Sequence, residues 1–208
     1  MKTDFCVGIA TINRADLLNE SLLKYFVDFS DIHILIVDNG NQDIIKRDKF
    51  FEIHRPKENC VASSWNYLMK RGNELGYKRV LILNDDIYLG KDRIEIGAII
   101  KQFIFADLIK GTKNFCAFIL TVFAHQLYGK FDENFKPAYF EDNDYLYRLK
   151  LADAYTITTE LLDPKIYRNS MTIMKDRSLN DNFQKNQDLY IEKWGGLPTE
   201  EKYKTPKI

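Results

Sequence analysis

Several features that would assign this chain of 208 residues to a common class are missing. No apolar run approaches the roughly 18 residues that a membrane-spanning helix needs, so no transmembrane segment is expected. Met1–Asp4 leads into a strand-like run without the long apolar region of a secretory signal peptide. The charges balance, with 30 Lys and Arg against 30 Asp and Glu, which leaves no overall field for nucleic acid or an anionic membrane.

Metal-binding and nucleophilic motifs are also scarce. Cys6, Cys60 and Cys116 form no Cys-x-x-Cys pair and have no zinc-ligand spacing. They are expected to be free thiols, which indicates a reducing compartment, here the cytoplasm, or the host cytoplasm for a viral protein. The histidines have no metal-ligand spacing either, and no glycine-rich phosphate loop of the GxxxxGK or GxGxxG type occurs.

What the sequence does contain favours a folded chain with a sizeable core. Hydrophobic residues make up 45% and charged residues 29%, with 14 Phe and 12 Tyr, a composition that argues against disorder. The length fits one domain, residues 1–208.

Short apolar runs alternate with amphipathic segments over the first half of the chain. This order predicts an α/β fold with a mixed, mostly parallel central sheet flanked by helices. The predicted strands are 5–10, 32–37, 51–54, 79–83 and 115–123. The predicted helices are one that starts within 13–16 and continues to 26, then 61–75, 94–109, a helix entered from an acidic loop within 139–153, and 186–194.

Polar clusters follow three of these strands: Thr11–Arg14, Asp38–Gly40 and Asn84–Asp86. In open α/β sheets, ligands bind beyond the carboxyl ends of the strands, so we expect the three clusters to converge. Two adjacent carboxylates, Asp85 and Asp86, at the mouth of a buried strand favour a hard divalent cation. A helix cap or a solvated turn explains the same residues equally well.

Two other segments have both a functional and a structural interpretation. Asp38 can accept a hydrogen bond from the imide N–H of a nucleobase, or it can stabilise a turn. Asn59 and Asn66 flank Ser63 and Ser64 at the expected start of a helix, where phosphate binds well and where serine is also a common cap.

The acidic cluster Glu141–Asp144 lies beside aromatic residues. A carboxylate against an apolar wall can have a raised pKa and accept a proton from an alcohol, which makes the cluster a candidate general base. Acidic residues at a helix start also suit the helix dipole, and that alternative stays open.

Taken in order, these segments resemble the family 2 glycosyltransferases of the GT-A fold, from about Phe5 to Pro206. The similarity is carried by Val7–Arg14, Ile36–Gly40, Asn59–Asn66, Leu81–Asp86 and the stretch Gly129–Asp144 with Arg148. Residues 190–196, Tyr-Ile-Glu-Lys-Trp-Gly-Gly, are also similar to this family.

The resemblance implies a nucleotide-binding half at about residues 1–90 and an acceptor-binding half at about 91–208. The donor would be a nucleotide-diphosphate sugar, most simply a UDP-sugar, and the acceptor a hydroxyl of a glycan or glycoprotein. The implied donor-binding residues are Thr11, Asn13, Arg14, Asp38, Asn39, Asn59, Ser64, Asn66, Asn84, Asp85 and Arg168. Asp86 would bind Mn²⁺ or Mg²⁺. Asp142 would be the catalytic base of an inverting transfer, with Glu141 and Asp144 as its neighbours.

The sequence departs from the family pattern at two places. Cys60 stands where relatives often have glycine, and 166–170 lacks the histidine that often completes the metal site. The metal would then depend on Asp86, the diphosphate and water, while Arg168 would meet the phosphates directly. A nucleotidyltransferase and a non-catalytic nucleotide-sugar-binding module are the alternative functions. The compact size is also similar to capsid-glycosylating enzymes of large DNA viruses and to bacterial surface-polysaccharide enzymes.

Overall fold

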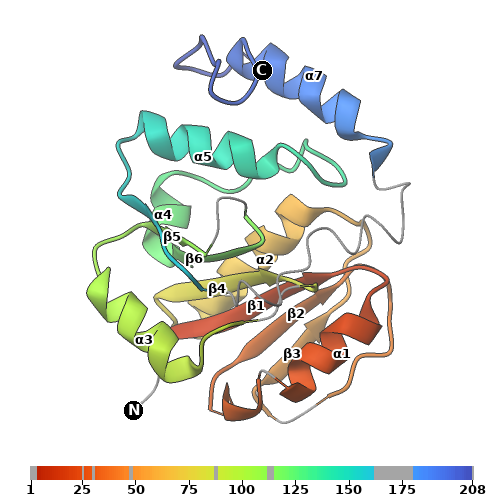
Figure 1. The fold of residues 1–208 in the computed structure, drawn as a ribbon. Helices are drawn as coiled ribbons and strands as arrows, with labels where there is room; N and C mark the ends of the chain where they lie inside the picture. Colours follow the sequence, from red (N-terminus) through yellow and green to blue (C-terminus); the bar gives the residue numbers. More distant parts are fainter. Residues whose placement is uncertain are drawn as a thin grey trace.

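A mixed sheet of seven strands organises the computed structural model, in the order β3-β2-β1-β4-β6-β5-β7 (Figure 1). The structure describes residues 4–24, 26–29, 31–46, 49–86, 89–111, 115–161 and 180–207. The strands are β1 Phe5–Thr11, β2 Ile34–Asp38, β3 Phe51–His54, β4 Arg79–Asn84, β5 Leu108–Lys110, β6 Ala117–Thr121 and β7 Thr156–Thr158. Only β6 runs against its neighbours in this sheet, since it pairs antiparallel with both β4 and β5.

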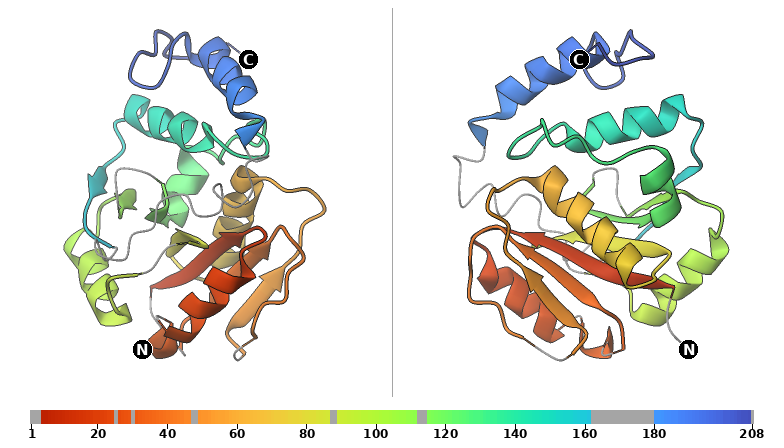
Figure 2. Two further views of the ribbon diagram at one scale, coloured as in Figure 1. Left: turned by 45° about the vertical axis from the view of Figure 1, so that its right-hand side comes forward. Right: turned by 180° about the vertical axis from the view of Figure 1, so that it is seen from behind.

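Helices cover both faces of the sheet. They are α1 Ala15–Lys24, α2 Val61–Glu74, α3 Arg93–Gln102, α4 Val122–Leu127, α5 Glu141–Leu151 and α7 Phe183–Trp194, with a short 3₁₀ turn η1 at Val27–Phe29. Figure 2 shows α1 and α2 on opposite faces, with α5 on the α2 side of the sheet and α7 stacked outside α5. No helix in the described part of the chain is long and apolar enough to cross a membrane.

Side-chain alternation along the strands divides the core. Val7 and Ile9 of β1 pack with α1 and α3 on one face, whereas Cys6 faces α2 on the other. Every residue of β2 is buried, and Ile34–Val37 form a continuous apolar run before Asp38, as expected for a parallel strand covered on both sides. A third apolar cluster joins α5 to α7 and consists of Phe135, Phe140, Tyr147, Tyr190 and Trp194.

The structure confirms the predicted fold class and most elements, and it corrects two of them. The predicted helix 94–109 ends at Gln102, and its last residues form β5. The predicted strand 115–123 ends at Thr121, whose side chain caps α4 by accepting from the amide of Ala124. The first error arises because β5 is defined by pairing with β6 and β7 and not by local periodicity. The second arises because the apolar run 115–123 continues past Thr121 into the first turn of α4.

Candidate functional site

The crevice beyond the carboxyl ends of β1, β2 and β4 is the candidate nucleotide site. Strand order reverses at β1, since β2 and β3 lie on one side of it and β4 on the other. The helices that follow β1 and β3 pack on opposite faces, so the loops after these strands diverge there. Open α/β sheets bind ligands at such a point, and this region is called the crevice below. The structure thus brings together the ends of the three strands at which the sequence places its polar clusters.

Asp85 ties two of these strand ends together. Its Oδ2 accepts hydrogen bonds from the hydroxyl of Thr11 at 2.8 Å and from the amide of Ile12 at 3.2 Å. Asp85 and Thr11 are both buried. Asp85 therefore fixes the loop after β1 against the end of β4, and this carboxylate shapes the crevice from within the protein.

Asp38 is held on all sides by groups of the protein. Its carboxylate accepts from the amides of Gly40 at 3.1 Å and Gln42 at 2.7 Å, and from the side chain of Gln42 at 3.1 Å. Arg55 Nε adds an ion pair at 3.1 Å. A carboxylate offers about four acceptor sites, so a nucleobase would have to displace one of these donors.

Gln42 and Arg55 are site residues that the sequence analysis missed. Gln42 also donates to the Thr11 hydroxyl at 3.2 Å and accepts from the amide of Ala15 at 2.6 Å. Arg55 directly follows β3, so it also lies at the carboxyl end of a parallel strand, where ligands bind in open α/β sheets. Gln42 could have been found from the sequence, because it is a polar residue only four positions after Asp38.

Asn39 and Ser64 link the crevice to the first turn of α2. Asn39 Nδ2 donates to Ser64 Oγ at 3.1 Å, and Ser64 Oγ donates to the carbonyl of Cys60 at 2.8 Å. Ser64 is buried, whereas Asn59 is exposed just before the helix. Cys60 is the N-cap residue of α2, and its side chain makes no capping bond.

Arg14 and Asp86 bring opposite charges to the mouth of the crevice, and both are buried. Arg14 donates through Nε and Nη2 to Asp16, while its buried Nη1 has no hydrogen-bond partner in the described part of the chain. Hydrogen bonding to Asp16 raises the pKa of Arg14, and the nearby negative charges of Asp85 and Asp86 raise this pKa further. An unsatisfied buried guanidinium N–H suits an anionic ligand.

Asn13 and Asn84 complete the rim. Asn13 is exposed and has a φ of 55°, a left-handed conformation that asparagine tolerates better than most residues. Gly40 packs directly against it, because a Cβ at Gly40 would lie 2.8 Å from both Asn13 N and Asn13 Oδ1. Asn84 is the last residue of β4, and its backbone N–H donates to the carbonyl of Cys116 at 2.9 Å.

Few side chains in this region could bind a metal ion. Within the described ranges, no group of three or more His, Cys, Asp or Glu side chains is arranged to hold an ion. Asp85 is already committed to Thr11 and Ile12, and Asp86 is the other buried carboxylate of this segment. Carboxylate oxygen is the ligand that Mg²⁺ and Mn²⁺ prefer, so the residues present fit one such ion only together with ligand oxygens.

Glu141 and Asp142 begin α5 and form a second acidic centre. Glu141 is buried, and its Oε2 has no hydrogen-bond partner among the described residues. Burial, reinforced by the charge of Asp142, raises the pKa of Glu141 well above its usual range. Burial also raises the pKa of Asp142, opposed by the Asn143 amide at 2.8 Å and by the positive charge of Lys110.

Lys110, at the end of β5, is a further residue that the sequence analysis did not identify. Burial lowers the pKa of Lys110, while the charge of Asp142 opposes that shift. The resulting centre contains two carboxyl groups, Glu141 and Asp142, whose pKa values are both raised, and the partly buried cation of Lys110. Adjacent carboxyl groups whose pKa values are pushed upward are typical of general acid–base sites, although structural networks also produce such shifts.

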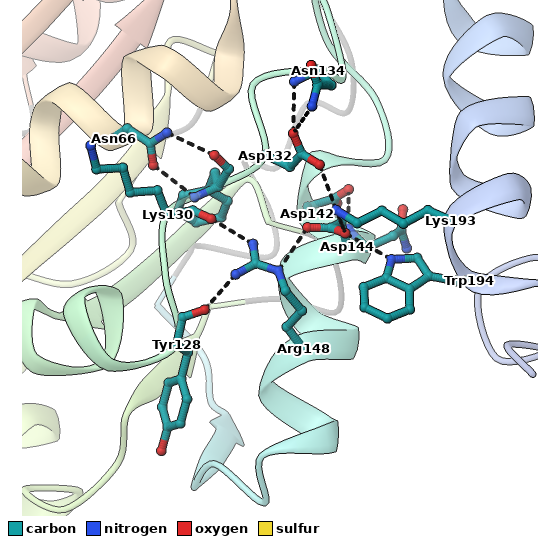
Figure 3. A network of polar contacts seen from close by, with 12 residues as sticks. Asn66, Tyr128, Lys130, Asp132, Asn134, Asp142, Asp144, Arg148, Lys193 and Trp194 are labelled. Atoms are coloured by element: carbon teal, nitrogen blue, oxygen red, sulfur yellow. Dashed lines mark hydrogen bonds and ion pairs between the residues drawn. The ribbon is translucent and has the colours of Figure 1, made fainter. Parts of the chain in front are cut away.

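Asp144 and Asn66 serve the protein's own packing. Asp144 is completely buried and accepts from Arg148, Trp194 and Lys193 (Figure 3). Asn66 exchanges hydrogen bonds with both backbone groups of Phe131 and contacts Glu133 and His125. These bonds use the full capacity of its amide, so a donor contact by Asn66 would need rearrangement. Arg168 lies outside the described residues.

The comparisons with known proteins support the fold. No protein-family model and no curated protein matches the sequence. The mannosyltransferase PcManGT from Pyrobaculum calidifontis, solved with GDP-Man and Mn²⁺, has a TM-score of 0.58 at 11% identity, over 77% of this chain and 55% of that one. Staphylococcus aureus TarS 1–349 in complex with UDP has a TM-score of 0.54 at 17% identity, over 77% of this chain and 58% of that one. This chain thus spans less than two thirds of either protein.

A third match is similar in size. A Desulfovibrio desulfuricans G20 protein classed as a nucleotide-diphospho-sugar transferase has a TM-score of 0.51 at 11% identity, over 89% of this chain and 98% of that one. At such low identities the shared property is the fold. The comparisons confirm that the chain has the GT-A fold of nucleotide-diphospho-sugar transferases, as the resemblance in sequence implied.

Proposed function

We propose that this protein is an inverting, metal-assisted glycosyltransferase that moves a sugar from a nucleotide-diphosphate sugar, by preference a UDP-sugar, to a hydroxyl of a glycan or glycoprotein acceptor. One observation carries the proposal. Polar strand ends at the strand-order reversal of a GT-A sheet occur in the same chain as a buried Glu141 and a half-buried Asp142 at the start of α5. Residues 1–90 would bind the donor and 91–208 the acceptor, in the cytoplasm.

The donor-side residues would bind different parts of the nucleotide sugar. Thr11, Asn13, Asp38 and Asn39 would face the nucleoside, with Asn84 beside the ribose. The unsatisfied Nη1 of Arg14 would donate to a diphosphate oxygen, a charge-assisted bond that strengthens as negative charge develops on the leaving group. Asp86 and the diphosphate oxygens would hold a Mn²⁺ or Mg²⁺ ion, which when bound supplies positive charge to the diphosphate.

Asp142 would be the base. Its carboxylate would take the proton of the acceptor hydroxyl while the acceptor oxygen attacks the anomeric carbon. The bond from that carbon to the diphosphate oxygen would break, and the nucleoside diphosphate would leave with the electron pair. Burial and the charge of Asp142 raise the pKa of Glu141 well above its usual range, so Glu141 would be the neighbour of the base and not the base itself.

Two alternative functions have less support. A nucleotidyltransferase would need a glycine-rich, basic loop after the first strand, and 12–14 is Ile-Asn-Arg. A non-catalytic binding module does not need two adjacent carboxyl groups with raised pKa values, which lower folding stability.

Calorimetric titration tests the donor side. UDP, dTDP, GDP and ATP are titrated with and without Mn²⁺. We expect at least one nucleoside diphosphate to bind, and to bind about tenfold or more tightly when Mn²⁺ is present. Asp86→Ala should remove most of the metal effect, and Asp43→Ala, at an exposed aspartate, should retain it. The glycosyltransferase proposal fails if no diphosphate binds, and preferential binding of ATP would favour the nucleotidyltransferase.

A second comparison tests the base. Asp142→Asn should keep metal-dependent diphosphate binding and lose about 100-fold or more of transfer. Asp153→Asn is the matched control, because Asp153 is an exposed residue just beyond the same helix and its left-handed φ of 51° suits asparagine. Unchanged turnover in Asp142→Asn would remove Asp142 from the mechanism.

A further inference from the structure

The turn that leads into α5 has an unusual backbone. Tyr139 and Phe140 have φ values of 80° and 71°, so two consecutive residues with side chains are left-handed immediately before Glu141. This conformation is unfavourable for bulky residues and persists only where surrounding contacts impose it. Phe140 is also the N-cap residue of α5, and its side chain makes no capping bond that could stabilise the turn.

Asn186 of α7 supplies the contacts that hold this turn. It is fully buried, and its Nδ2 donates to the carbonyls of Lys136 at 3.2 Å, Ala138 at 2.7 Å and Tyr139 at 3.4 Å. One side-chain NH₂ group, with its two N–H donors, thus lies within hydrogen-bond distance of three carbonyls between Lys136 and Tyr139, and the contact to Ala138 is the shortest. The ring of Phe183, also on α7, packs 5.1 Å from Tyr139 and 5.3 Å from Phe140 between ring centroids.

Lys193, two helical turns along α7, fixes the helix that follows the turn. Its Nζ lies 2.7 Å from Asp144 and 2.6 Å from Asp132, and its side chain is 8% exposed. Figure 3 shows this ammonium between the two carboxylates, with the Trp194 indole aimed at Asp144. Trp194 Nε1 donates to the same carboxylate at 2.9 Å.

Arg148 completes the network from within α5. It donates to Asp144 at 3.0 Å and to the carbonyls of Tyr128 and Lys130 at 2.6 and 2.7 Å. Two cations and two carboxylates thus balance in a mostly buried group that joins α7, α5 and the loop before α5. Loss of Lys193 would leave Asp132 and Asp144 with one cation between them, and a buried charge without its partner is unfavourable.

We propose that Asn186 and Lys193 are positioning residues for the Glu141–Asp142 pair. Asn186 sets the turn that precedes the pair, and Lys193 sets the helix that carries it. This inference rests on the proposed function and extends it, because it makes α7 part of the acceptor side of the enzyme. The residues act through backbone and helix placement and touch no substrate.

Steady-state kinetics on the whole chain test the proposal. Asn186→Ala and Lys193→Met should each lower kcat by about 10- to 100-fold, because small misplacements of a catalytic group have effects of this size. The Kd for the diphosphate, measured calorimetrically with Mn²⁺, should change by less than about twofold, since the donor crevice lies on other elements. The apparent pKa of the kcat profile should also move, which a loss of folded protein alone would not cause.

Matched variants separate positioning from damage. Lys185→Met removes an exposed lysine from the same helix and should leave kcat and the pH profile as in the wild type. Trp194→Phe removes only the N–H donor to Asp144 and keeps an aromatic ring in the cluster, so it should fold and still lower kcat by about threefold or more. Circular dichroism and cooperative thermal melting identify the folded variants.

The outcomes distinguish this inference from the proposed function. A wild-type chain that neither binds a diphosphate nor transfers sugar overturns the function. An active wild type with folded variants of unchanged kcat and pH profile overturns only the role of Asn186 and Lys193. Equal losses of kcat and diphosphate binding would also overturn that role, because they indicate a general disturbance.

Discussion

The carboxylate of Asp85 accepts a 2.8 Å hydrogen bond from the hydroxyl of Thr11, 74 residues away in the sequence. This contact joins the end of β4 to the end of β1 at the floor of the candidate nucleotide crevice. Asp85 therefore holds the two strand ends together, which leaves Asp86 as the candidate metal ligand of this segment.

Thr11→Val should destabilise the protein by about 1–3 kcal/mol, because the buried carboxylate of Asp85 loses the hydroxyl donor that lies 2.8 Å away. Urea denaturation measures the loss. Thr205→Val, at an exposed threonine, should change the free energy of unfolding by less than about 0.5 kcal/mol. Equal stability of the two variants would mean that the Thr11–Asp85 bond contributes nothing.

Asp38→Asn should both destabilise the protein and weaken nucleotide binding. The new amide would present N–H groups to Gly40, Gln42 and Arg55, which already donate to this position. A loss of about 1–3 kcal/mol is expected in the free energy of unfolding. Asp43→Asn provides the exposed control. Tighter nucleoside diphosphate binding in Asp38→Asn would contradict the prediction.

Gly40→Ala should weaken diphosphate binding and destabilise the fold by about 1–3 kcal/mol, since its Cβ would meet Asn13 N and Oδ1 at 2.8 Å. The comparison variant is Gly97→Ala in α3, where a Cβ would meet nothing within 4 Å. That change should stabilise the protein by about 0.5–1 kcal/mol through better helix propensity. Similar effects of the two alanines in calorimetry and denaturation would count against the close packing at Gly40.

Glu141→Gln should stabilise the protein in a pH-dependent way. A carboxyl whose pKa is raised by folding keeps its proton in the folded state while it ionises in the unfolded chain. Folding stability therefore falls as pH rises above the ordinary value of 4.5 and levels off only above the folded-state pKa. Glutamine cannot ionise, so the variant should gain about 1 kcal/mol or more over the wild type near pH 7 and little near pH 4.

The measurement for Glu141→Gln is denaturation across this pH range. The charge of Asp142 acts on Glu141, and the charge of Lys110 acts on Asp142. Both residues are kept in the variant, so that only the Glu141 carboxyl group changes. Glu160→Gln, at an exposed glutamate, should show no such pH dependence. A constant difference between Glu141→Gln and the wild type at all pH values would show that burial of Glu141 does not raise its pKa.

Most of the sheet could be predicted from the sequence because its strands are locally unambiguous. Phe5–Thr11 and Arg79–Asn84 are apolar runs that end in polar turns, so the alternation placed both the strands and the crevice. β5 and β7 could not be found in this way. They are three residues each, and their pairing partners, not their composition, make them strands.

The sequence by itself determined where polar groups collect, since the carboxyl ends of parallel strands meet at one edge whatever surrounds them. It also indicated the acidic start of α5. Only the tertiary structure decided which of these groups the protein uses for itself. Asp38 is engaged by Gln42 and Arg55, and Asp144 by Lys193 and Trp194 from 50 residues along the chain. Hydrogen bonds and ion pairs of this kind depend on distances between remote segments, and local sequence patterns carry no information about such distances.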